Sequence, residues 1–295
     1  MKLEEVMKGI PYEVIQRGAG EISSLSYDSR TVQPGACCAC ERGRTHDGAD
    51  YLAEDYQKGA AAAVLERIPR QCPPGMTLLK VKNIRAAMPR MAANFYKGCL
   101  DGVSVTGITG TNGKTTTTYI LRSILSTCGK KVGIIGTNEV SYCGKTRVAT
   151  LTTPDPIELH GIFRDMADSG VEFVAMEASA HALALKKLDG ISFSSVGFTN
   201  FTRDHLDYFG DMEAYGRAKA SLFSKERSRV AVINTDDDFG MKLYGERTDA
   251  ITYGKRGYVC AENAEYNADG TSFTLKIGDE RAAAHLNLPG QYNLY

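Results

Sequence analysis

The sequence lacks several features that would each place it in a particular class of protein. Its formal charges cancel, with 35 lysine and arginine residues against 35 aspartate and glutamate residues, so no overall field attracts nucleic acid or an anionic membrane. Any phosphate binding must therefore come from a local arrangement. No apolar run reaches the length of a membrane span, and the start, MKLEEVMKGI, is not a signal peptide. We expect a cytoplasmic protein with no nucleic-acid partner and no membrane insertion; the absence of tryptophan excludes nothing further.

Paired zinc-binding cysteines are also missing. Three of the eight cysteines, Cys37, Cys38 and Cys40, lie in the run CCAC, which is too close for the usual zinc spacing. No C-x-x-C pair stands elsewhere in the chain to complete a site. We interpret these residues as small buried hydrophobes.

The 295 residues are enough for two domains, both of α/β type. The first, residues 1–98, is predicted to have strands at 22–26, 36–40, 60–65 and 77–81 and helices at 3–8, 51–58 and 84–96. The second, residues 99–295, is predicted to have strands at 103–108, 131–136, 171–177, 191–199 and 229–234, with helices at 115–128, 157–168, 213–223 and 236–245. This alternation predicts a mainly parallel sheet with helices on both faces. From residue 250 the pattern changes to an antiparallel, β-rich extension.

The strongest chemical signal is VSVTGITGTNGKTTTT, residues 103–118. A β-branched run precedes a loop with Gly107, Gly110 and Gly113, and Lys114 and Thr115 stand where a helix should begin. Such a loop turns backbone N–H groups toward an anion, so it is suited to nucleotide phosphates, with Lys114 reaching the β- and γ-phosphates and Thr115 ligating Mg²⁺. The first glycine stands one place before its position in the strict pattern GxxxxGK(S/T). The alternative is a glycine turn that binds nothing.

Two further groups of polar residues follow predicted strands of the second domain. Glu177 ends the strand VEFVAME, where P-loop ATPases place a Mg²⁺-binding acid, although it could also cap the next helix. A second group stands in FTNFTRDHLDYFG and comprises Asn200, Asp204, His205 and Asp207. His205 is a candidate for metal or phosphate contact, and the alternative is a structural histidine.

Other candidate positions are ambiguous from the residues alone. The loops that contain Asp28-Ser29-Arg30 and Arg44-Thr45-His46 follow strands of the first domain and could bind a ligand or serve as a turn and a helix cap. Thr152-Thr153 fits a turn as well as a substrate clamp. Lys219, within the helix segment AYGRAKASLF, would ordinarily be a solvated lysine.

Taken together, these motifs resemble the Mur ligases of peptidoglycan synthesis, most closely the members that add the third residue of the stem peptide. The resemblance covers essentially the whole chain. It is carried by DSR with PG, GTNGKTTTT, TTPDP, MEASAHAL, FTNFTRDHLDYFGDM and AKASLF, whose joint occurrence is very specific. It implies a uridine-binding first domain and a P-loop ATPase second domain. The chain ends at LPGQYNLY, inside a family element, so we expect a truncated chain that lacks the family's C-terminal amino-acid-binding domain.

The resemblance also implies roles for single residues. The UDP end of the substrate would be held by Ser29, Arg44, Thr45 and His46, and its diphosphate and muramoyl part by Thr152, Thr153, Ser179 and Lys187. ATP would be held by Gly110, Thr111, Asn112, Gly113, Lys114, Thr115, Thr116, Asn200 and Asn293. Two Mg²⁺ ions would be bound with Thr115, Glu177 and His205. Lys219 would be the lysine that family members carbamylate with CO₂, and it would act with Lys114, Glu177 and His205 as catalytic machinery.

The implied reaction is ATP-dependent amide formation through an acyl phosphate on UDP-MurNAc-L-Ala-D-Glu. The added amino acid would be diaminopimelate in preference to lysine, and the protein would be a monomer. The chain departs from the family pattern at Leu151, Ala180, Lys187 and Phe209. Two other interpretations stay open. One is a non-catalytic or regulatory module that retains the UDP-sugar and ATP sites. The other is a small-molecule kinase or GTPase, which would need neither the DSR domain nor Lys219.

Overall fold

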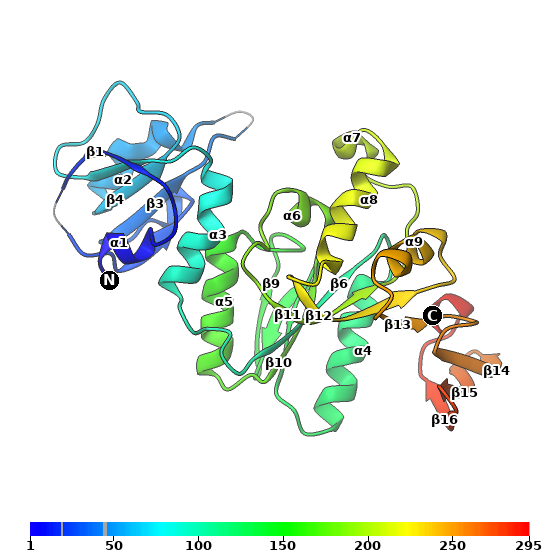
Figure 1. The fold of residues 1–295 in the computed structure, drawn as a ribbon. Helices are drawn as coiled ribbons and strands as arrows, with labels where there is room; N and C mark the ends of the chain where they lie inside the picture. The colour runs from blue at the N-terminus through cyan, green and yellow to red at the C-terminus, as the bar shows by residue number, and fades with distance from the viewer. Residues whose placement is uncertain (19, 44–45, 295) are drawn as a thin grey trace. The chain divides into compact units, whose positions relative to one another are not determined.

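A computed structural model of the protein describes residues 1–18, 20–43 and 46–294. The chain forms two compact units (Figure 1). Unit 1 comprises Met1–Asp101, Pro154–Asp168 and Leu185–Gly190, and unit 2 comprises Gly102–Thr153, Ser169–Ala184 and Ile191–Tyr295. Unit 1 therefore includes the segment 154–168, which the sequence pattern alone places in the second domain. Both units are built from helices and strands, so the predicted α/β class is confirmed.

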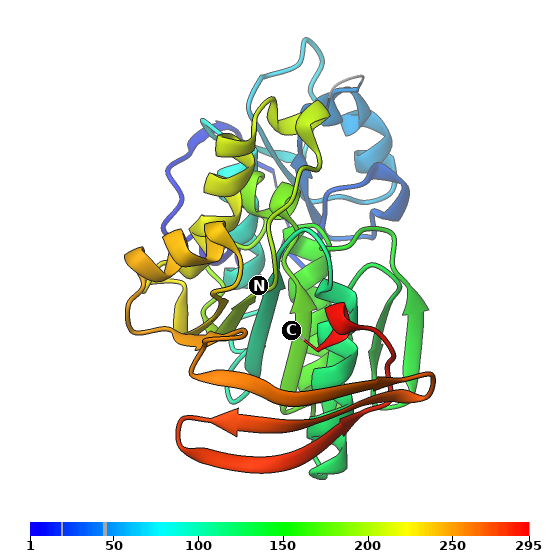
Figure 2. The same cartoon turned by 90° about the vertical axis from the view of Figure 1, so that its right-hand side faces the viewer.

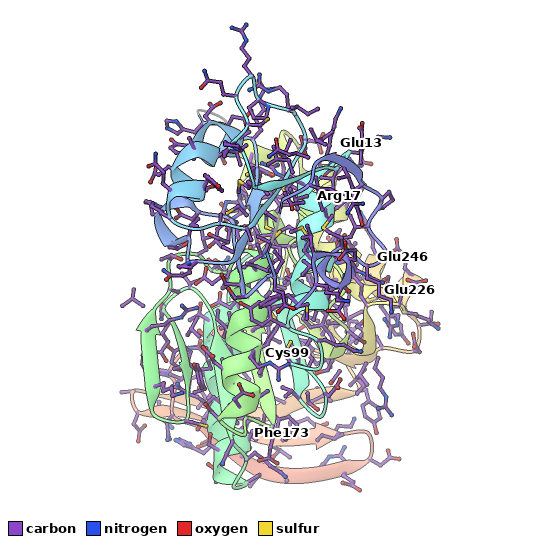
Figure 3. The ribbon with its side chains drawn as sticks, turned by 90° about the vertical axis from the view of Figure 1, so that its left-hand side faces the viewer. Glu13, Arg17, Cys99, Phe173, Glu226 and Glu246 are labelled. Atoms are coloured by element: carbon purple, nitrogen blue, oxygen red, sulfur yellow. The ribbon has the colours of Figure 1, made fainter. Side chains whose placement is uncertain are left out.

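Unit 1 is built on one five-stranded sheet in the order β1-β5-β4-β3-β2. Its strands are β1 (Glu13–Gln16), β2 (Ser24–Ser26), β3 (Ala36–Cys40), β4 (Ala62–Leu65) and β5 (Thr77–Lys80). Its helices are α1 (Leu3–Val6), α2 (Leu52–Gln57), α3 (Ile84–Phe95) and α5 (Pro156–Asp168), with 3₁₀ turns η1 (Ser29–Thr31) and η2 (Gly48–Tyr51). β2 to β5 run parallel, whereas β1 pairs antiparallel with β5 at the sheet edge. Figure 3 labels Glu13 in β1 and Arg17 just after it.

The alternation of side chains along a strand gives unit 1 two apolar cores, one on each face of its sheet. In β3, Cys37 packs in one core with residues of α1 and α3, while Cys38 and Cys40 pack in the other with Leu52 of α2. All three cysteines are buried, as expected of small hydrophobes. α5 joins the first core through Ile157 and lies beside α3, as Figure 1 shows.

Unit 2 contains an eleven-stranded sheet in the order β16-β15-β14-β13-β12-β11-β6-β10-β7-β8-β9. Its parallel strands are β6 (Ser104–Thr109), β7 (Val132–Ile135), β10 (Phe173–Glu177), β11 (Phe193–Phe198), β12 (Ser228–Asn234) and β13 (Ile251–Tyr253). Its helices are α4 (Lys114–Thr127), α6 (Ala180–Ala184), α7 (Leu206–Phe209), α8 (Met212–Ala220) and α9 (Asp238–Glu246), with 3₁₀ turns η3 (Ser221–Phe223) and η4 (Gln291–Asn293). The parallel pairing places the carboxyl ends of β6, β10 and β11 at one edge of the sheet.

Antiparallel pairs flank the parallel part on both sides. On one side, β8 (Glu139–Tyr142) pairs antiparallel with β7, and β9 (Lys145–Val148) pairs antiparallel with β8. On the other side, β14 (Val259–Asn267) still runs parallel to β13, and β15 (Gly270–Ile277) and β16 (Glu280–Leu286) continue the sheet in antiparallel pairs. Figure 2 shows β14 to β16 as neighbouring strands, coloured orange to red. The predicted antiparallel extension is therefore wrong for its first two pairings, β12 with β13 and β13 with β14, which are both parallel. β13 runs parallel to β12 because α9 returns the chain to the same end of the sheet before β13 begins.

Two other expectations need correction. The helix predicted at 213–223 is α8 followed by the separate 3₁₀ turn η3, and the strand predicted at 22–26 starts only at Ser24. Among the described residues, none of the helices combines the length and the apolar character that crossing a membrane requires.

Candidate functional site

The loop between β6 and α4 has the backbone that the glycine spacing predicts. Gly110 and Gly113 have φ angles of 144° and 83°, in the region that favours glycine, and α4 begins at Lys114. The residues after β11 brace this loop. Thr111 N donates to Asn200 O at 2.8 Å, and Asn112 N donates to Asn200 Oδ1 at 3.0 Å. The loop is thus fixed before any ligand arrives.

Lys114 lies over this loop. Its Nζ donates to the carbonyl oxygens of Gly110 at 3.0 Å and Thr111 at 2.8 Å. Burial lowers the pKa of Lys114, and the nearby carboxylates of Glu177 and Asp204 oppose that effect. Phosphate oxygens are stronger acceptors than backbone carbonyls for an ammonium group, so an incoming phosphate can replace these two bonds.

Glu177, at the end of β10, is buried and meets the first turn of α4. Thr115 Oγ1 donates to Glu177 Oε1 at 2.8 Å, and Thr137 N donates to the same oxygen at 2.9 Å. Thr137 Oγ1 donates to Glu177 Oε2 at 3.1 Å. A Cβ on Gly136 would stand 2.3 Å from Glu177 Oε1, so the strand end must carry a glycine there. The structure therefore brings Thr115 and Glu177 together, as the sequence predicts.

The carboxylate of Glu177 and the hydroxyl of Thr115 form an oxygen donor pair, which suits a hard cation such as Mg²⁺. In the described part of the chain, no group of three or more His, Cys, Asp and Glu side chains could hold a metal ion. Mg²⁺ commonly takes only one or two carboxylates from the protein and completes its shell with phosphates and water. The residues present fit such a partial site.

Lys219 is only 1% exposed, which is the reverse of the solvated lysine that its helix pattern alone indicates. Its Nζ donates to Gly110 O at 2.7 Å and lies 4.4 Å from the centre of the Tyr215 ring. Burial and the neighbouring Lys114 charge lower the pKa of Lys219 to about 7, and Asp204 partly opposes them. A large share of Lys219 amines is therefore neutral, and nucleophilic, near neutral pH.

His205 is placed by tight backbone geometry, with a φ of 53°, at the start of α7. Its ring packs edge-on against that of His181, with 4.8 Å between ring centres, and its Nε2 lies 3.5 Å from Asp204 Oδ2. Ala180, a departure from the family pattern, is buried in an apolar cluster with Tyr215 and Ala218, and the Tyr215 ring centre lies 5.8 Å from that of His205.

A cavity of about 800 Å³ lies in unit 2, between α4 and the strands β6, β11 and β12. Its lining includes five of the predicted nucleotide-binding residues, Asn112, Gly113, Thr116, Asn200 and Asn293. Tyr253 also lines this cavity, and its hydroxyl donates a hydrogen bond to Phe198 O at 3.0 Å. The volume falls in the range of small-molecule and cofactor pockets.

Three predicted substrate-binding hydroxyls stand in unit 2. Thr152 Oγ1 lies 3.1 Å from Thr137 Oγ1, which itself bonds Glu177. Thr153 is buried, and its hydroxyl donates to Glu177 O at 2.8 Å and lies 3.2 Å from Ser179 Oγ. Thr152 is better placed than Thr153 to meet a ligand, because its bond to Thr137 is exposed whereas Thr153 is buried.

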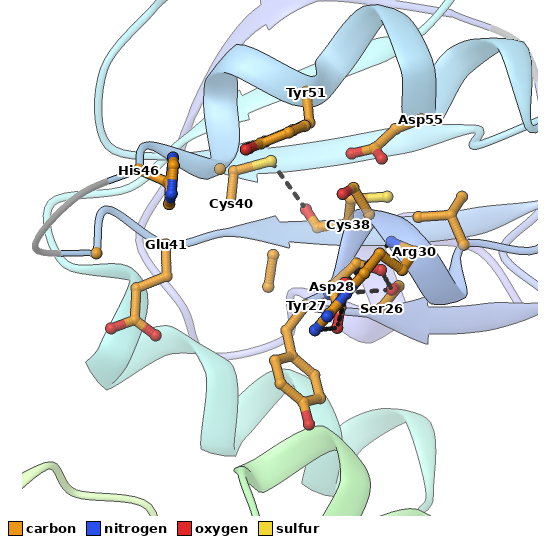
Figure 4. A pocket seen from close by; sticks show the side chains of 15 residues that line it. Ser26, Tyr27, Asp28, Arg30, Cys38, Cys40, Glu41, His46, Tyr51 and Asp55 are labelled. Carbon is orange, nitrogen blue, oxygen red and sulfur yellow. Dashed lines mark hydrogen bonds and ion pairs between the residues drawn. The ribbon is translucent and has the colours of Figure 1, made fainter.

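The remaining predicted substrate residues belong to unit 1. Ser29 and His46 line a cavity of about 630 Å³ beside β3 and η2, shown in Figure 4. Lys187 forms an ion pair with Asp155, with 2.8 Å from Nζ to Oδ1. Arg44 and Thr45 lie outside the described residues.

Two residues that contact the predicted site residues, Thr137 and Tyr215, were not predicted from the sequence. Thr137 links Thr152 to Glu177, and its signal is its place directly after a predicted strand that neighbours the one ending in Glu177. Tyr215 stands four residues before Lys219, so both lie on one face of α8. The sequence around each of them fits an ordinary turn or core residue equally well.

A braced glycine loop at a helix N-terminus, with a lysine over it and an acid on the adjacent parallel strand, defines an α/β protein of the phosphate-loop class. This chain belongs to the Mur ligase family. The Mur ligase middle domain matches residues 108–295, and the Mur ligase family catalytic domain matches residues 21–96. The family resemblance predicted from the motifs is confirmed.

Named relatives of this chain include UDP-N-acetylmuramoyl-L-alanyl-D-glutamate--2,6-diaminopimelate ligases. The protein of that name from Geobacter metallireducens is 41% identical over 306 residues, which cover all of this chain and 60% of the relative. A second, from Clostridium acetobutylicum, is 39% identical over 300 residues, which cover all of this chain and 61% of the relative. The chain thus spans about three-fifths of the length of these relatives.

Solved structures share the fold. A UDP-N-acetylmuramoyl-L-alanyl-D-glutamate--2,6-diaminopimelate ligase superposes with a TM-score of 0.83 at 24% identity, covering 99% of this chain and 61% of that one. The MurF ligase of Thermotoga maritima in complex with ADP has a TM-score of 0.62 at 20% identity, covering 92% of this chain and 60% of the other.

Proposed function

We propose that this chain is the nucleotide- and UDP-sugar-binding part of an ATP-dependent amide ligase of peptidoglycan precursor synthesis. The substrate is UDP-MurNAc-L-Ala-D-Glu, and the added amino acid is meso-diaminopimelate in preference to lysine. Relatives that cover the whole chain at 35–41% identity are named as 2,6-diaminopimelate ligases, which supports this choice. The observation that carries the proposal is the convergence of Lys114, Thr115, Glu177 and Lys219 on one glycine loop.

In the proposed reaction, the γ-phosphoryl group of ATP passes to the D-Glu side-chain carboxylate, and an amine then displaces phosphate from the acyl phosphate. Both first reactants are anions, so the protein must offset their repulsion. Lys114 and the N–H groups of residues 110–116 hold the ATP phosphates. Asn200 and Asn293 contribute to the nucleotide pocket. No side chain needs to act as a nucleophile.

Mg²⁺ ions, when bound, would neutralise part of the phosphate charge. We assign one of the two to Thr115 and Glu177, and we take His205 as a candidate ligand of the other. Thr137 orients the Glu177 carboxylate through two hydrogen bonds, and that support favours a fixed direction of the carboxylate.

Lys219 is proposed as the site of a CO₂-derived carbamate. The neutral amine attacks the carbon of CO₂, an N–C bond forms, and one proton leaves the nitrogen for solvent. The product carries a negative charge in place of a positive one, so it can support a cation and pair with Lys114. The buried amine beside Gly110 O supports this assignment.

The substrate's UDP end is assigned to the unit 1 cavity with Ser29 and His46, together with Arg44 and Thr45. Thr152, Thr153, Ser179 and Lys187 are assigned to the diphosphate and muramoyl part. The family supports both assignments, and the lining of the unit 1 cavity supports those of Ser29 and His46.

Calorimetric titration tests the proposal through binding, because binding needs no amine pocket. Wild-type protein should bind UDP-MurNAc-L-Ala-D-Glu, and it should separately bind a non-hydrolysable ATP analogue with Mg²⁺. Lys114→Ala should abolish binding of the analogue and leave binding of the UDP substrate unchanged. Lys242→Ala, at an exposed lysine of α9, is the matched control. Equal loss of both ligands in Lys114→Ala would contradict the two-site proposal.

A further inference from the structure

The segment after β11 that braces the phosphate loop, residues 199–202, is itself fixed by a further residue. Phe201 N, within this segment, donates a hydrogen bond to Asp237 Oδ2 at 2.8 Å. Asp237 directly precedes α9, and its Oδ1 accepts from the first turn of that helix, from Phe239 N at 2.9 Å and Gly240 N at 3.1 Å. One half-buried carboxylate therefore joins the start of α9 to the bracing segment.

The bracing segment makes the bonds that fix the phosphate loop. Asn200 accepts from the backbone N–H groups of Thr111 and Asn112. Thr202 N donates to Thr111 Oγ1 at 3.0 Å. Thr199 Oγ1 donates to Asn112 O at 2.6 Å. A displacement of the segment would therefore also displace the backbone N–H groups that are proposed to hold the ATP phosphates.

A helix cap alone does not require a carboxylate at position 237. Serine and asparagine cap helices about as well as aspartate, and a cap uses a single acceptor oxygen. Asp237 uses its second oxygen outside the helix, on Phe201 N. Hydrogen bonds to an ionised acceptor are stronger than those between neutral groups. The bond to Phe201 is therefore what distinguishes Asp237 from an ordinary helix cap.

Ring packing around Phe201 supports the same connection. The centre of its ring lies 4.4 Å from that of Phe239 in α9 and 5.1 Å from that of Tyr215 in α8. The Tyr215 hydroxyl in turn lies 3.3 Å from Thr111 Oγ1 of the phosphate loop. The start of α9 thus contacts the bracing segment through a hydrogen bond and through an aromatic stack.

We propose that Asp237 is a positioning residue of the ATP site, which holds the bracing segment, and through it the phosphate loop, in the conformation that binds nucleotide. The inference deepens the proposed function and rests on it for the presence of ATP at this loop. Its physical basis is preorganisation. When the segment is already fixed, binding does not have to order it, so the affinity for the nucleotide is higher.

Calorimetric titration with the non-hydrolysable ATP analogue and Mg²⁺ tests this role in Asp237→Ser. Serine keeps one oxygen that can cap α9 and lacks the second oxygen that Phe201 N needs. The affinity for the analogue should fall by about tenfold, as the loss of one hydrogen bond to a charged group predicts. Binding of UDP-MurNAc-L-Ala-D-Glu should stay within about twofold of wild type, because sites without shared partners behave independently.

The matched control is Asp238→Ser, which replaces an exposed acid in the first turn of the same helix. It should bind both ligands as wild type does. Equal loss of both ligands in Asp237→Ser would indicate a general loss of folded structure and would overturn the inference.

A second comparison separates positioning from helix stability. Asp237→Ala removes the cap of α9 as well as the bond to Phe201, so it should unfold at a lower temperature than Asp237→Ser. If Asp237 acts by positioning, the two variants should bind the analogue about equally, because both lack the same bond. Affinity that instead falls in step with the unfolding temperature would mean that Asp237 only stabilises the helix, and the inference would be wrong.

A double-mutant cycle tests whether the effect passes through the bracing segment. Asn200→Ala and Asp237→Ser both loosen the same contact between segment and loop, so together they should weaken binding by clearly less than the product of their single effects. Effects that multiply fully would contradict the proposed route.

Failure of the inference and failure of the proposed function are distinguishable. If wild type binds the analogue and Asp237→Ser binds it equally well, Asp237 does not position the loop, while the proposed function stands. If wild type does not bind the analogue, the proposed ATP site and the role of Asp237 both fall.

Discussion

Gly110 O accepts hydrogen bonds from two lysines, Lys114 at 3.0 Å and Lys219 at 2.7 Å. Two ammonium groups on one carbonyl oxygen repel each other, and Lys219 bears more of the consequence because it is nearly fully buried. The loop therefore holds one lysine that is poised to bind phosphate and another that readily loses its proton. The same carbonyl connects the two functions proposed for them.

The altered pKa of Lys219 predicts how stability depends on pH. In the folded protein the pKa is lowered from 10.5 to about 7, so between these values the unfolded chain holds a proton that the folded chain has lost. The free energy of unfolding must then rise with pH across this window, and the cost of the buried charge is fully present below pH 7. Relative to Lys219→Met, wild type should gain on the order of 3 kcal/mol between pH 7 and pH 10.

Urea denaturation in CO₂-free buffer at several pH values measures this difference. Lys242→Met, which replaces an exposed lysine of α9, serves as the control and should run parallel to wild type. Parallel curves for wild type and Lys219→Met would show that Lys219 titrates normally in the folded protein.

At the scale of elements, the phosphate loop depends on how closely it approaches the end of β11. A Cβ on Gly110 would stand 1.8 Å from Thr199 Oγ1. Thr199 cannot turn away freely, because that hydroxyl donates to Asn112 O at 2.6 Å. The contact between loop and strand therefore leaves no room for any side chain at position 110.

Gly110→Ala should consequently lower the free energy of unfolding by about 3 kcal/mol or more and abolish binding of the ATP analogue. Gly129→Ala is the matched control, since Gly129 also has a positive φ of 75° but meets nothing within 4 Å. It should cost roughly 1 kcal/mol and leave nucleotide binding intact. Urea denaturation and calorimetry test both variants, and equal effects of the two would refute the steric argument.

The regular spacing of apolar residues explains which helices and strands could be predicted. β3, β4, β6, β10, β11 and α3 to α5 are buried or amphipathic, so their patterns stand out against the flanking turns. β9 reads KTRV, is exposed along its whole length, and forms only by pairing with β8. β1 is likewise an edge strand, and each of its residues is exposed or only half-buried. Strands of this kind are specified by their neighbours, which a single stretch of sequence does not reveal.

The candidate site also contains some features that the sequence predicts and others that it does not. The phosphate loop and Glu177 were predictable because their spacing and position in the sequence follow from the chemistry of phosphate binding. The burial of Lys219, the link through Thr137 and the bond from Phe201 to Asp237 depend on which helices and strands meet. Only the resemblance to the family singled out Lys219, and nothing in the sequence singled out the other two.

At the scale of the whole molecule, the chain enters unit 2 at Gly102 and then returns twice to unit 1. The first return, Pro154–Asp168, consists almost entirely of α5. Within unit 1, Ile157 of α5 joins the apolar core of β3 and α3. Arg164 Nη2 donates to Lys97 O at 2.6 Å, and the Tyr27 hydroxyl donates to Glu158 Oε2 at 3.2 Å. A segment that the sequence order assigns to one domain thus completes the core of the other.

This packing predicts which unit loses stability when a buried side chain of α5 is shortened. Ile157→Ala should lower the free energy of unfolding of unit 1 by about 2–4 kcal/mol, since Ile157 is 4% exposed and packs in that core. Hydrogen exchange followed by mass spectrometry should therefore show faster exchange in β3 and α3, with little change in β6 and α4. Ile124→Ala, at a residue of α4 that is 57% exposed, should leave exchange in both units nearly unchanged. Faster exchange confined to β6 and α4 in Ile157→Ala would mean that α5 stabilises unit 2 instead, and that the order of the sequence rather than the packing defines the domains.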